Sequence, residues 1–136
     1  MLITEARKLE LVQRAVEARR HAYAPYSSYP VGAALLTGTG KVFTGANVEN
    51  AAYPTGMCAE RTALFHAVSE GERVFAAIAV VTENAGTPCG SCRQALSEFG
   101  LDTIVLIAQA SGRIASETTV GELLPQAFSA GDLHPV

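Results

Sequence analysis

Apolar residues recur at intervals of three, four or seven over residues 2–23, which is the spacing of one face of an α-helix. Pro25 follows this segment and ends it, because proline cannot continue a helix. Two shorter apolar runs occupy residues 29–36 and 42–48, and the glycine-rich segment 37–40 that joins them is typical of a hairpin. The pattern therefore predicts an amphipathic helix followed by two antiparallel strands.

Helices and strands alternate in the second part of the chain. Helical periodicity at residues 58–69 and 89–99 alternates with almost continuous apolar runs at 74–81 and 103–108, which are typical of strands covered on both faces. This alternation favours right-handed crossovers and at least one parallel pair of strands. A short helical stretch is expected at 121–124, and the last residues of the chain are expected to be loose. We therefore predict an α/β sandwich built on a mixed sheet.

The composition fits one globular domain that spans residues 1–136. Of the 136 residues, 49% are hydrophobic and 17% are charged, so a core can form and no block of like charge holds the chain open. The formal net charge of −3 provides no basic surface for nucleic acid or an anionic membrane. No apolar run reaches the roughly 18–20 residues of a membrane helix, and the N-terminus does not resemble a secretory signal. We expect a cytoplasmic protein that binds neither nucleic acid nor a membrane.

All three cysteines lie at predicted helix starts. Cys58 begins one helix, and Cys89 and Cys92 begin the other, where residues three apart are neighbours and can hold one ion. The exposed N–H groups of a helix N-terminus lower the pKa of a thiol and favour the thiolate. An odd number of cysteines without a secretory signal also argues against a disulfide framework. The three thiolates are therefore candidate ligands for one zinc ion per chain.

Three protein ligands are the number typical of a catalytic zinc site, because a structural site closes all four positions with cysteine or histidine. The histidines do not suggest a fourth ligand, and we interpret them as surface or packing residues: His21, His66 and His134. The fourth position would then belong to water.

Glu60 lies in the first turn of the helix that Cys58 begins. There its carboxylate can take a proton from water at the metal and return it to a leaving amine. The plainer interpretation is an acidic residue that complements the helix N-terminus. Three thiolates leave a zinc site with a charge of about −1. Arg61 and Arg93 are candidates to offset that charge by donating hydrogen bonds to the thiolates; otherwise both are solvated surface charges.

The Cys89-x-x-Cys92 element has two rival interpretations. A thiol–disulfide oxidoreductase also needs a dithiol at a helix start, but it leaves Cys58 and Glu60 unexplained. A structural zinc module needs a further pair of Cys or His ligands, and the chain offers only one further cysteine.

Two short elements match the signature of zinc-dependent deaminases, in which a His or Cys lies two residues before a Glu and a Pro-Cys-x-x-Cys sequence follows. These elements are Cys58-Ala-Glu60 and Pro88-Cys-Gly-Ser-Cys92. Nearly the whole chain resembles the small, homotetrameric cytidine deaminases. Five segments carry the resemblance: Tyr26–Leu35, Phe43–Asn50, Cys58–Leu64, Pro88–Gln94 and Glu122–Phe128. It implies a three-layer α/β/α sandwich on a mixed five-stranded sheet. It also implies a zinc-dependent hydrolase of pyrimidine salvage that converts cytidine and 2′-deoxycytidine to uridine and 2′-deoxyuridine.

The resemblance also implies roles for single residues. The three cysteines would hold zinc, Glu60 would transfer the proton, and Asn47 and Glu49 would bind the 3′-hydroxyl of the ribose. Residues two apart on a strand face the same side, so these two polar groups can converge on one sugar edge. The plainer interpretation of Asn47 and Glu49 is a polar strand end that faces solvent.

Three further positions are informative by resemblance. Tyr29 stands where the family commonly has a phenylalanine that packs against the pyrimidine, so the ring is kept and a hydroxyl is added. Ala46 stands where many members have a cysteine that is not a ligand. Phe128 lies in a segment that, in the family, enters the active site of a neighbouring subunit of the tetramer; its plainer interpretation is a core aromatic of its own subunit.

Three alternatives remain at this stage. A deaminase of another small aminopyrimidine, such as the blasticidin S group, shares the zinc motifs, although Asn47 and Glu49 favour a nucleoside substrate. A polynucleotide-editing deaminase needs a basic channel, which the acidic composition argues against. A non-enzymatic zinc module is the third alternative.

Overall fold

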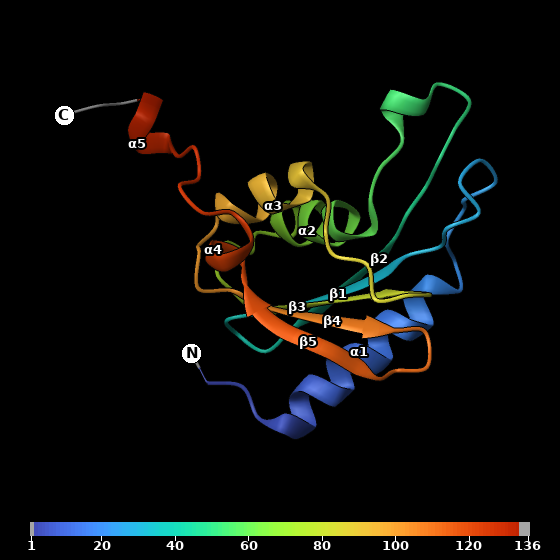
Figure 1. Cartoon of the computed structure of the whole chain (residues 1–136). Coiled ribbons are helices and arrows are strands. Elements are labelled where there is room, and N and C mark those ends of the chain that lie inside the picture. The colour runs from blue at the N-terminus through green and yellow to red at the C-terminus, as the bar shows by residue number, and fades with distance from the viewer. Residues whose placement is uncertain (1, 134–136) are drawn as a thin grey trace.

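The structure is a computed structural model that describes residues 2–133. In it, a central sheet lies between helices (Figure 1). Its elements, in chain order, are α1 (Glu5–Arg19), β1 (Gly32–Thr37), β2 (Val42–Ala46), η1 (Tyr53–Thr55), α2 (Ala59–Ser69), β3 (Phe75–Thr82), α3 (Gly90–Ser97), β4 (Ile104–Gln109), β5 (Ile114–Thr119), α4 (Val120–Leu123) and α5 (Ala130–Leu133).

The sheet has the strand order β2-β1-β3-β4-β5. The β1–β2 hairpin is antiparallel, as its glycine-rich turn predicts, and β3 and β4 form the expected parallel pair. The β1–β3 and β4–β5 pairs are antiparallel, so the sheet is mixed. The mixed five-stranded sheet is therefore confirmed.

The sheet is covered on both faces, which makes the molecule a three-layer sandwich (Figure 1). On one face, α1 buries Leu11 and Val12 against the sheet. On the other face, α2 and α3 bury Leu64 and Leu96. All eight residues of β3 are buried, because its alternate side chains point into the two opposite layers. The prediction of a strand covered on both faces is confirmed.

Three features differ from the pattern-based prediction. The strand β5 is absent from that pattern because its sequence, Ile-Ala-Ser-Glu-Thr-Thr, is mostly polar and exposed, as suits an edge strand that pairs only with β4. The first helix is shorter than residues 2–23: Thr4 caps it by accepting a hydrogen bond from the Arg7 N–H, and it ends at Arg19. The helix α5 was not expected. The expectation of a loose chain end falls on residues 134–136, which lie outside the described residues.

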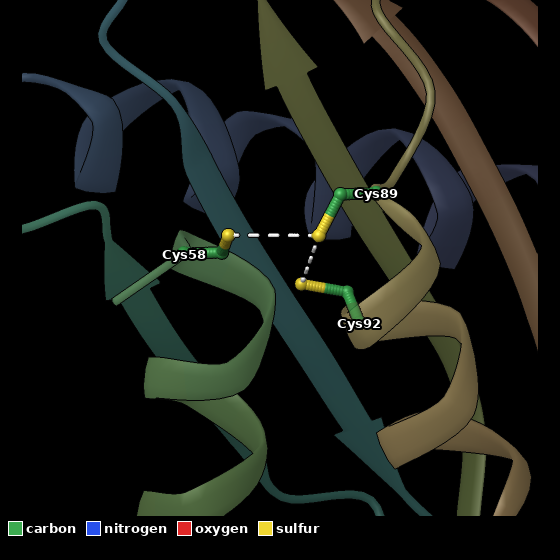
Figure 2. A group of neighbouring side chains, drawn as sticks. All are labelled: Cys58, Cys89 and Cys92. Carbon is green, nitrogen blue, oxygen red and sulfur yellow. Dashed lines mark hydrogen bonds between the residues drawn. The ribbon is translucent and has the colours of Figure 1, made fainter. Parts of the chain in front are cut away.

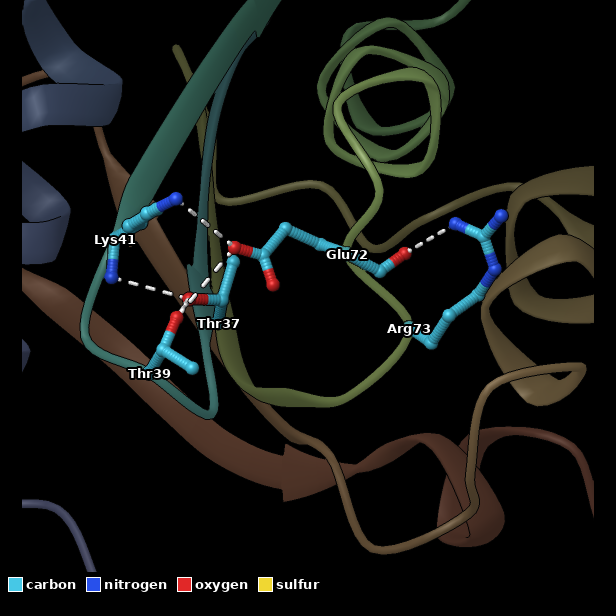
Figure 3. A network of polar contacts seen from close by, with 5 residues as sticks. All are labelled: Thr37, Thr39, Lys41, Glu72 and Arg73. Carbon is cyan, nitrogen blue, oxygen red and sulfur yellow. Dashed lines mark hydrogen bonds and ion pairs between the residues drawn. The ribbon is translucent and has the colours of Figure 1, made fainter.

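Polar contacts fasten the turn of the β1–β2 hairpin to the segment between α2 and β3 (Figure 3). The Lys41 ammonium lies 3.7 Å from a carboxylate oxygen of Glu72, and the Thr39 hydroxyl donates to the same oxygen at 3.4 Å. The Lys41 N–H donates to the Thr37 hydroxyl at 3.0 Å. These contacts lie at the end of β1 that is remote from the cysteines. Within residues 2–133 no helix is long and apolar enough to cross a membrane.

Candidate active site

Four segments converge at one edge of the sheet. Gly32 begins β1 and pairs with Ala46, where β2 ends, and with Val81, near the end of β3. The residues before β1, after β2 and after β3 therefore meet at this edge, and α2 begins there as well. This is also the carboxyl end of the parallel β3–β4 pair, which is where open α/β sheets usually bind their ligands.

The three cysteines meet at this edge, as Figure 2 shows. Cys58 is the N-cap residue of α2, Cys89 is the N-cap residue of α3, and Cys92 lies in the first turn of α3. The Cys89 sulfur lies 3.8 Å from the Cys58 sulfur and 3.6 Å from the Cys92 sulfur. All three sulfur atoms lie within 4.8 Å of one another. The structure therefore brings together the three thiols that the sequence nominates as ligands of one ion.

The spacing of the sulfurs fits a zinc ion. Thiolates bound at about 2.3 Å to a tetrahedral zinc ion lie about 3.8 Å apart, which agrees with the two sulfur–sulfur distances. Within residues 2–133 these cysteines form the only group of three or more Cys, His, Asp and Glu side chains spaced to hold a metal. Three protein ligands leave one position for water or substrate. The donor set is therefore that of a catalytic zinc site.

The described histidines lie in other environments. His66 stacks edge-on against Phe43, with ring centroids 5.1 Å apart, and its Nε2 is 3.8 Å from Glu70. His21 is exposed just beyond α1. His134 lies outside the described residues.

The environment of the sulfurs favours a thiolate at Cys58. Its pKa is lowered to about 5 because the Cys92 thiol donates to it and because the Arg61 guanidinium, 3.5 Å away, donates as well. The pKa of Cys92 is raised because its proton is held by Cys58 and because the side chain is buried. Arg61 thus donates a hydrogen bond to a cysteine sulfur, as the sequence-based hypothesis proposes.

Arg93 does not contact a thiolate, which corrects the sequence-based hypothesis. Its Nε donates to the Pro88 carbonyl at 2.7 Å, its Nη2 donates to the Thr87 hydroxyl at 3.0 Å, and its Nη1 donates to the Leu123 carbonyl at 2.9 Å. The planar guanidinium reaches all three acceptors because its donors diverge in a fixed fork. Arg93 therefore fastens the segment before Cys89 to the end of α4.

Glu60 is 4% exposed in the first turn of α2, and it lines the same cavity as Cys58 and Cys89. Burial raises the pKa of its carboxyl group, and the neighbouring Cys58 thiolate raises it further. A carboxyl group whose pKa is raised toward neutrality can both accept and return a proton. The position and the environment of Glu60 both suit proton transfer.

The cavity that contains these groups has a volume of about 240 Å³. Asn47 lines it and is buried, and its amide bridges the chain before β1: Oδ1 accepts from the Val31 N–H at 2.8 Å, and Nδ2 donates to the Tyr29 carbonyl at 2.9 Å. An amide nitrogen carries two hydrogens, so one donor of Asn47 is left for a ligand.

Glu49 also lines this cavity, and it holds the chain at residues 26–27. Its Oε1 accepts from the backbone N–H groups of Tyr26 and Ser27 at 3.0 Å, and its Oε2 accepts from the Ser27 hydroxyl. These donors lower the pKa of Glu49, the Ser27 hydroxyl most of all. A carboxylate has about four acceptor positions, so a ligand hydroxyl can still bind. The interpretation of Asn47 and Glu49 as a solvent-facing strand end does not fit these contacts.

The Tyr29 ring lines the cavity, and its hydroxyl donates to the Asn84 side chain at 2.6 Å. Sequence reasoning missed this partner, and it also missed Thr82 and Gly86 in the cavity wall. No local motif marks these residues; the only signal is that their segment connects a buried strand to the Pro-Cys-x-x-Cys element.

Phe128 does not line the cavity of its own chain. Its side chain is 56% exposed, and it lies near the end of α3, where the Gln94 side chain donates to the Phe128 carbonyl at 2.9 Å. The interpretation of Phe128 as a core aromatic of its own subunit is therefore wrong.

Comparison with known proteins gives one consistent family. Residues 6–108 match the family described as the cytidine and deoxycytidylate deaminase zinc-binding region, a span that includes all three cysteines and Glu60. The cytidine deaminase of Sporosarcina psychrophila is 50% identical over 127 residues, which cover 91% of this chain and 93% of that protein. The cytidine deaminase of Halalkalibacterium halodurans is 52% identical over 127 residues, which cover 91% and 96%.

The fold agrees with a solved structure from the same family. The crystal structure of cytidine deaminase from Burkholderia pseudomallei superposes with a TM-score of 0.83 at 49% sequence identity, covering 93% of this chain and all of that one.

Proposed function

The chain belongs to the family of zinc-binding cytidine and deoxycytidylate deaminases, and we propose that it catalyses the hydrolytic deamination of cytidine and 2′-deoxycytidine to uridine and 2′-deoxyuridine. One observation carries the proposal: three sulfurs lie at zinc spacing, and two of the cysteines, Cys58 and Cys89, share a cavity with the buried Glu60. The whole chain, residues 1–136, would act as one catalytic domain.

Cys58, Cys89 and Cys92 would hold one zinc ion per chain. When bound, the zinc ion supplies Lewis acidity that lowers the pKa of a coordinated water molecule. The site carries an excess of negative charge with three thiolates, and the Arg61 guanidinium beside Cys58 offsets part of it.

Glu60 moves the protons of the reaction. Its carboxylate accepts a proton from the attacking water, whose oxygen adds to C4 of the pyrimidine. Glu60 gives this proton to N3, then takes the second proton from the new C4 hydroxyl and passes it to the amino group, which leaves as ammonia as the C4–oxygen bond becomes a carbonyl. Because the carboxyl group is buried, solvent has little access to its proton between these transfers.

The lining of the cavity supports a nucleoside rather than a nucleotide. Asn47 keeps one free N–H and Glu49 keeps acceptor capacity, and both would bind the ribose 3′-hydroxyl. The described residues that line the cavity include no Lys or Arg, whereas they include the Glu49 carboxylate, which repels a phosphate. The Tyr29 ring would pack against the pyrimidine.

We assign the enzyme to a homotetramer, to the cytoplasm and to pyrimidine salvage. The cavity opens to solvent, and Phe128 is exposed and does not line the cavity of its own chain. Both features support a site that a second copy of the chain completes, because hydrolytic sites work best when bulk water is excluded.

Loss of the cytidine absorbance band on incubation with the purified zinc-loaded protein tests the proposal. Cytidine and 2′-deoxycytidine are expected to react. Cytidine 5′-monophosphate, single-stranded DNA and blasticidin S serve as comparison substrates and are expected to react far more slowly. Faster conversion of any comparison substrate would replace the proposed substrate class, and no conversion of any substrate would overturn the activity.

A further inference from the structure

The added hydroxyl of Tyr29 reaches a segment that is distant in sequence. Tyr29 precedes β1, whereas its hydrogen-bond acceptor Asn84 follows β3, 55 residues later. The Asn84 oxygen also accepts from the hydroxyl of Thr82 at 3.5 Å, and that hydroxyl in turn accepts from the Gly86 N–H at 2.6 Å. Thr82 is 3% exposed, so this network is anchored in the end of a buried strand. The hydroxyl thus joins the two walls of the cavity.

Gly86 provides the space that the hydroxyl occupies. A Cβ atom built on Gly86 would overlap the Tyr29 hydroxyl oxygen. The next atoms, the Thr82 hydroxyl oxygen and the Tyr29 Cζ, would lie at 3.5 and 3.6 Å, which is ordinary van der Waals contact. Gly86 is not among the described glycines with positive φ, so its backbone also suits alanine. The absence of a side chain at residue 86 therefore makes room for the Tyr29 hydroxyl, whereas the backbone conformation there does not require glycine.

The segment held in this way delivers a zinc ligand. Residues 83–88 run from the end of β3 to Cys89, and Gly86, Thr87 and Cys89 all line the cavity. A displacement of this segment would therefore move both the wall of the cavity and one of the three sulfurs.

We propose that the Tyr29 hydroxyl is a positioning group that, together with Gly86 and Asn84, holds residues 83–88 in place. By holding this segment, it also sets the position of the Cys89 sulfur and the shape of the nucleoside cavity. Its effect on KM rests on the proposed function, whereas its effect on zinc retention does not. Tyr29 thereby combines two tasks: its ring faces the cavity and its hydroxyl holds the opposite wall.

A set of three variants tests this proposal: Gly86→Ala, Tyr29→Phe and the double variant. The methyl group of Gly86→Ala collides with the hydroxyl, so we expect zinc release to a chelator to accelerate at least tenfold and KM for cytidine to rise by a similar factor. Tyr29→Phe loses one partly exposed hydrogen bond and should change either quantity by about threefold. The double variant has no hydroxyl to collide with and should return to within about twofold of Tyr29→Phe.

Gly90→Ala is the matched control, because it adds the same methyl group next to Cys89 at a position where no atom lies within 4 Å apart from its chain neighbours and its own helix backbone. It should leave zinc release and KM unchanged. A general loss of packing would lower the melting temperature in the single and double Gly86 variants alike and would show no rescue by Tyr29→Phe.

Asn84→Ala and the Tyr29→Phe/Asn84→Ala pair measure the hydrogen bond itself. Asn84→Ala also removes the contact with the Thr82 hydroxyl, so it should impair the protein at least as much as Tyr29→Phe. The pair should be no worse than Asn84→Ala alone, because both substitutions remove the same Tyr29–Asn84 bond. Additive effects would overturn the assigned partner. Unchanged zinc release in Gly86→Ala, or a double variant as impaired as Gly86→Ala, would overturn the positioning role. Normal zinc behaviour with no turnover of cytidine by the unaltered chain would instead overturn the proposed substrate and leave this inference standing.

Discussion

At the scale of single residues, the sulfur cluster makes a direct prediction about metal content. Because Cys89 lies within 3.8 Å of both other sulfurs, Cys89→Ala removes the central ligand of the group. The unaltered protein is expected to contain about one zinc per chain, and the variant should lose most of it. Ser91→Ala, in the same turn of α3, is the control and should keep its zinc. Metal analysis by mass spectrometry decides the matter, and undiminished zinc in Cys89→Ala would remove this residue from the ligand set.

Glu60→Gln separates proton transfer from metal binding. The amide keeps the size of the side chain but cannot accept and return a proton, so turnover should fall by about 10²- to 10⁴-fold. Zinc content should stay near one per chain, since Glu60 is not one of the grouped ligands. Glu70→Gln at the other end of α2 is the control, with turnover close to that of the unaltered chain. Steady-state kinetics and metal analysis on the same samples provide both readouts, and a fully active Glu60→Gln would exclude it as the proton carrier.

The hydrogen bonds to Glu49 make stability depend on pH. Its folded-state pKa is lowered below the ordinary value of 4.5, chiefly by the Ser27 hydroxyl, so the ionised carboxylate stabilises the fold. This contribution is fully present above pH 4.5 and is lost as the pH falls through the lowered pKa. Glu49→Gln should therefore melt below the unaltered chain at pH 7, and the gap should shrink below pH 4.5.

Glu83→Gln is the control for Glu49→Gln, because Glu83 is exposed and makes no hydrogen bond or ion pair within residues 2–133. It should melt like the unaltered chain at both pH values. A gap for Glu49→Gln that stays constant from pH 7 into the acid range would show that the Ser27 contacts do not depend on its charge.

The residues that could be predicted from sequence are those whose partners are close along the chain or share a motif. Cys58 and Glu60 occupy one helical turn, and their chemistry follows from that spacing. The contact between Arg93 and Leu123 and the contact between Tyr29 and Asn84 could not be predicted, because they join segments 30 and 55 residues apart. Such contacts depend on the strand order, which a single sequence does not determine.

At the scale of secondary-structure elements, most of the fold follows from hydrophobic periodicity, and the exception has a physical reason. The buried strand β3 is easily predicted because every residue faces a core layer. The edge strand β5 is not, because residues 115–117 are exposed and the strand forms largely through pairing with β4, which its own polar sequence does not reveal. The bounds of α1 depend on the Thr4 cap, which periodicity alone does not locate.

Arg93, in α3, connects this helix to the segment before Cys89 and to the end of α4, so its removal should lower the stability of the fold. Arg93→Met leaves the carbonyl groups of Pro88 and Leu123 without their donors, at a cost of about 1–3 kcal/mol for each that stays buried. We expect the melting temperature to fall by several degrees and zinc release to accelerate, because the segment before Cys89 loosens. Arg93→Lys should recover only part of the loss, since one ammonium cannot reach all three acceptors.

The exposed Arg14 on α1 provides the control for Arg93, because its side chain makes no hydrogen bond or ion pair within the described part of the chain. Arg14→Met should melt within about a degree of the unaltered chain, as surface substitutions usually do. A complete rescue by Arg93→Lys would show that charge, and not the planar fork of donors, is what fastens these elements.

At the scale of the whole molecule, the segment between α4 and α5 extends away from the sheet (Figure 1). It carries Phe128, which is 56% exposed and lies outside the cavity of its own chain. The chain thus has an exposed aromatic side chain on an extended segment and a separate cavity that is open to solvent, and this combination supports exchange of the segment between copies of the chain. Phe128→Ala should therefore raise KM for cytidine and leave the zinc content unchanged.

Mixing two defective variants distinguishes a shared site from a site within one chain. In an assembly of Phe128→Ala and Glu60→Gln chains at equal amounts, about a quarter of the sites would combine an intact Glu60 from one chain with an intact Phe128 from a neighbour. Co-expression with two different tags and purification through both should therefore yield activity with the KM of the unaltered enzyme. If Phe128 acts within its own chain, no site in the mixture has both groups, and the mixture keeps the high KM of Phe128→Ala. Sedimentation of the unaltered enzyme as a fully active monomer would likewise contradict the shared site, because no neighbour would be present to supply Phe128.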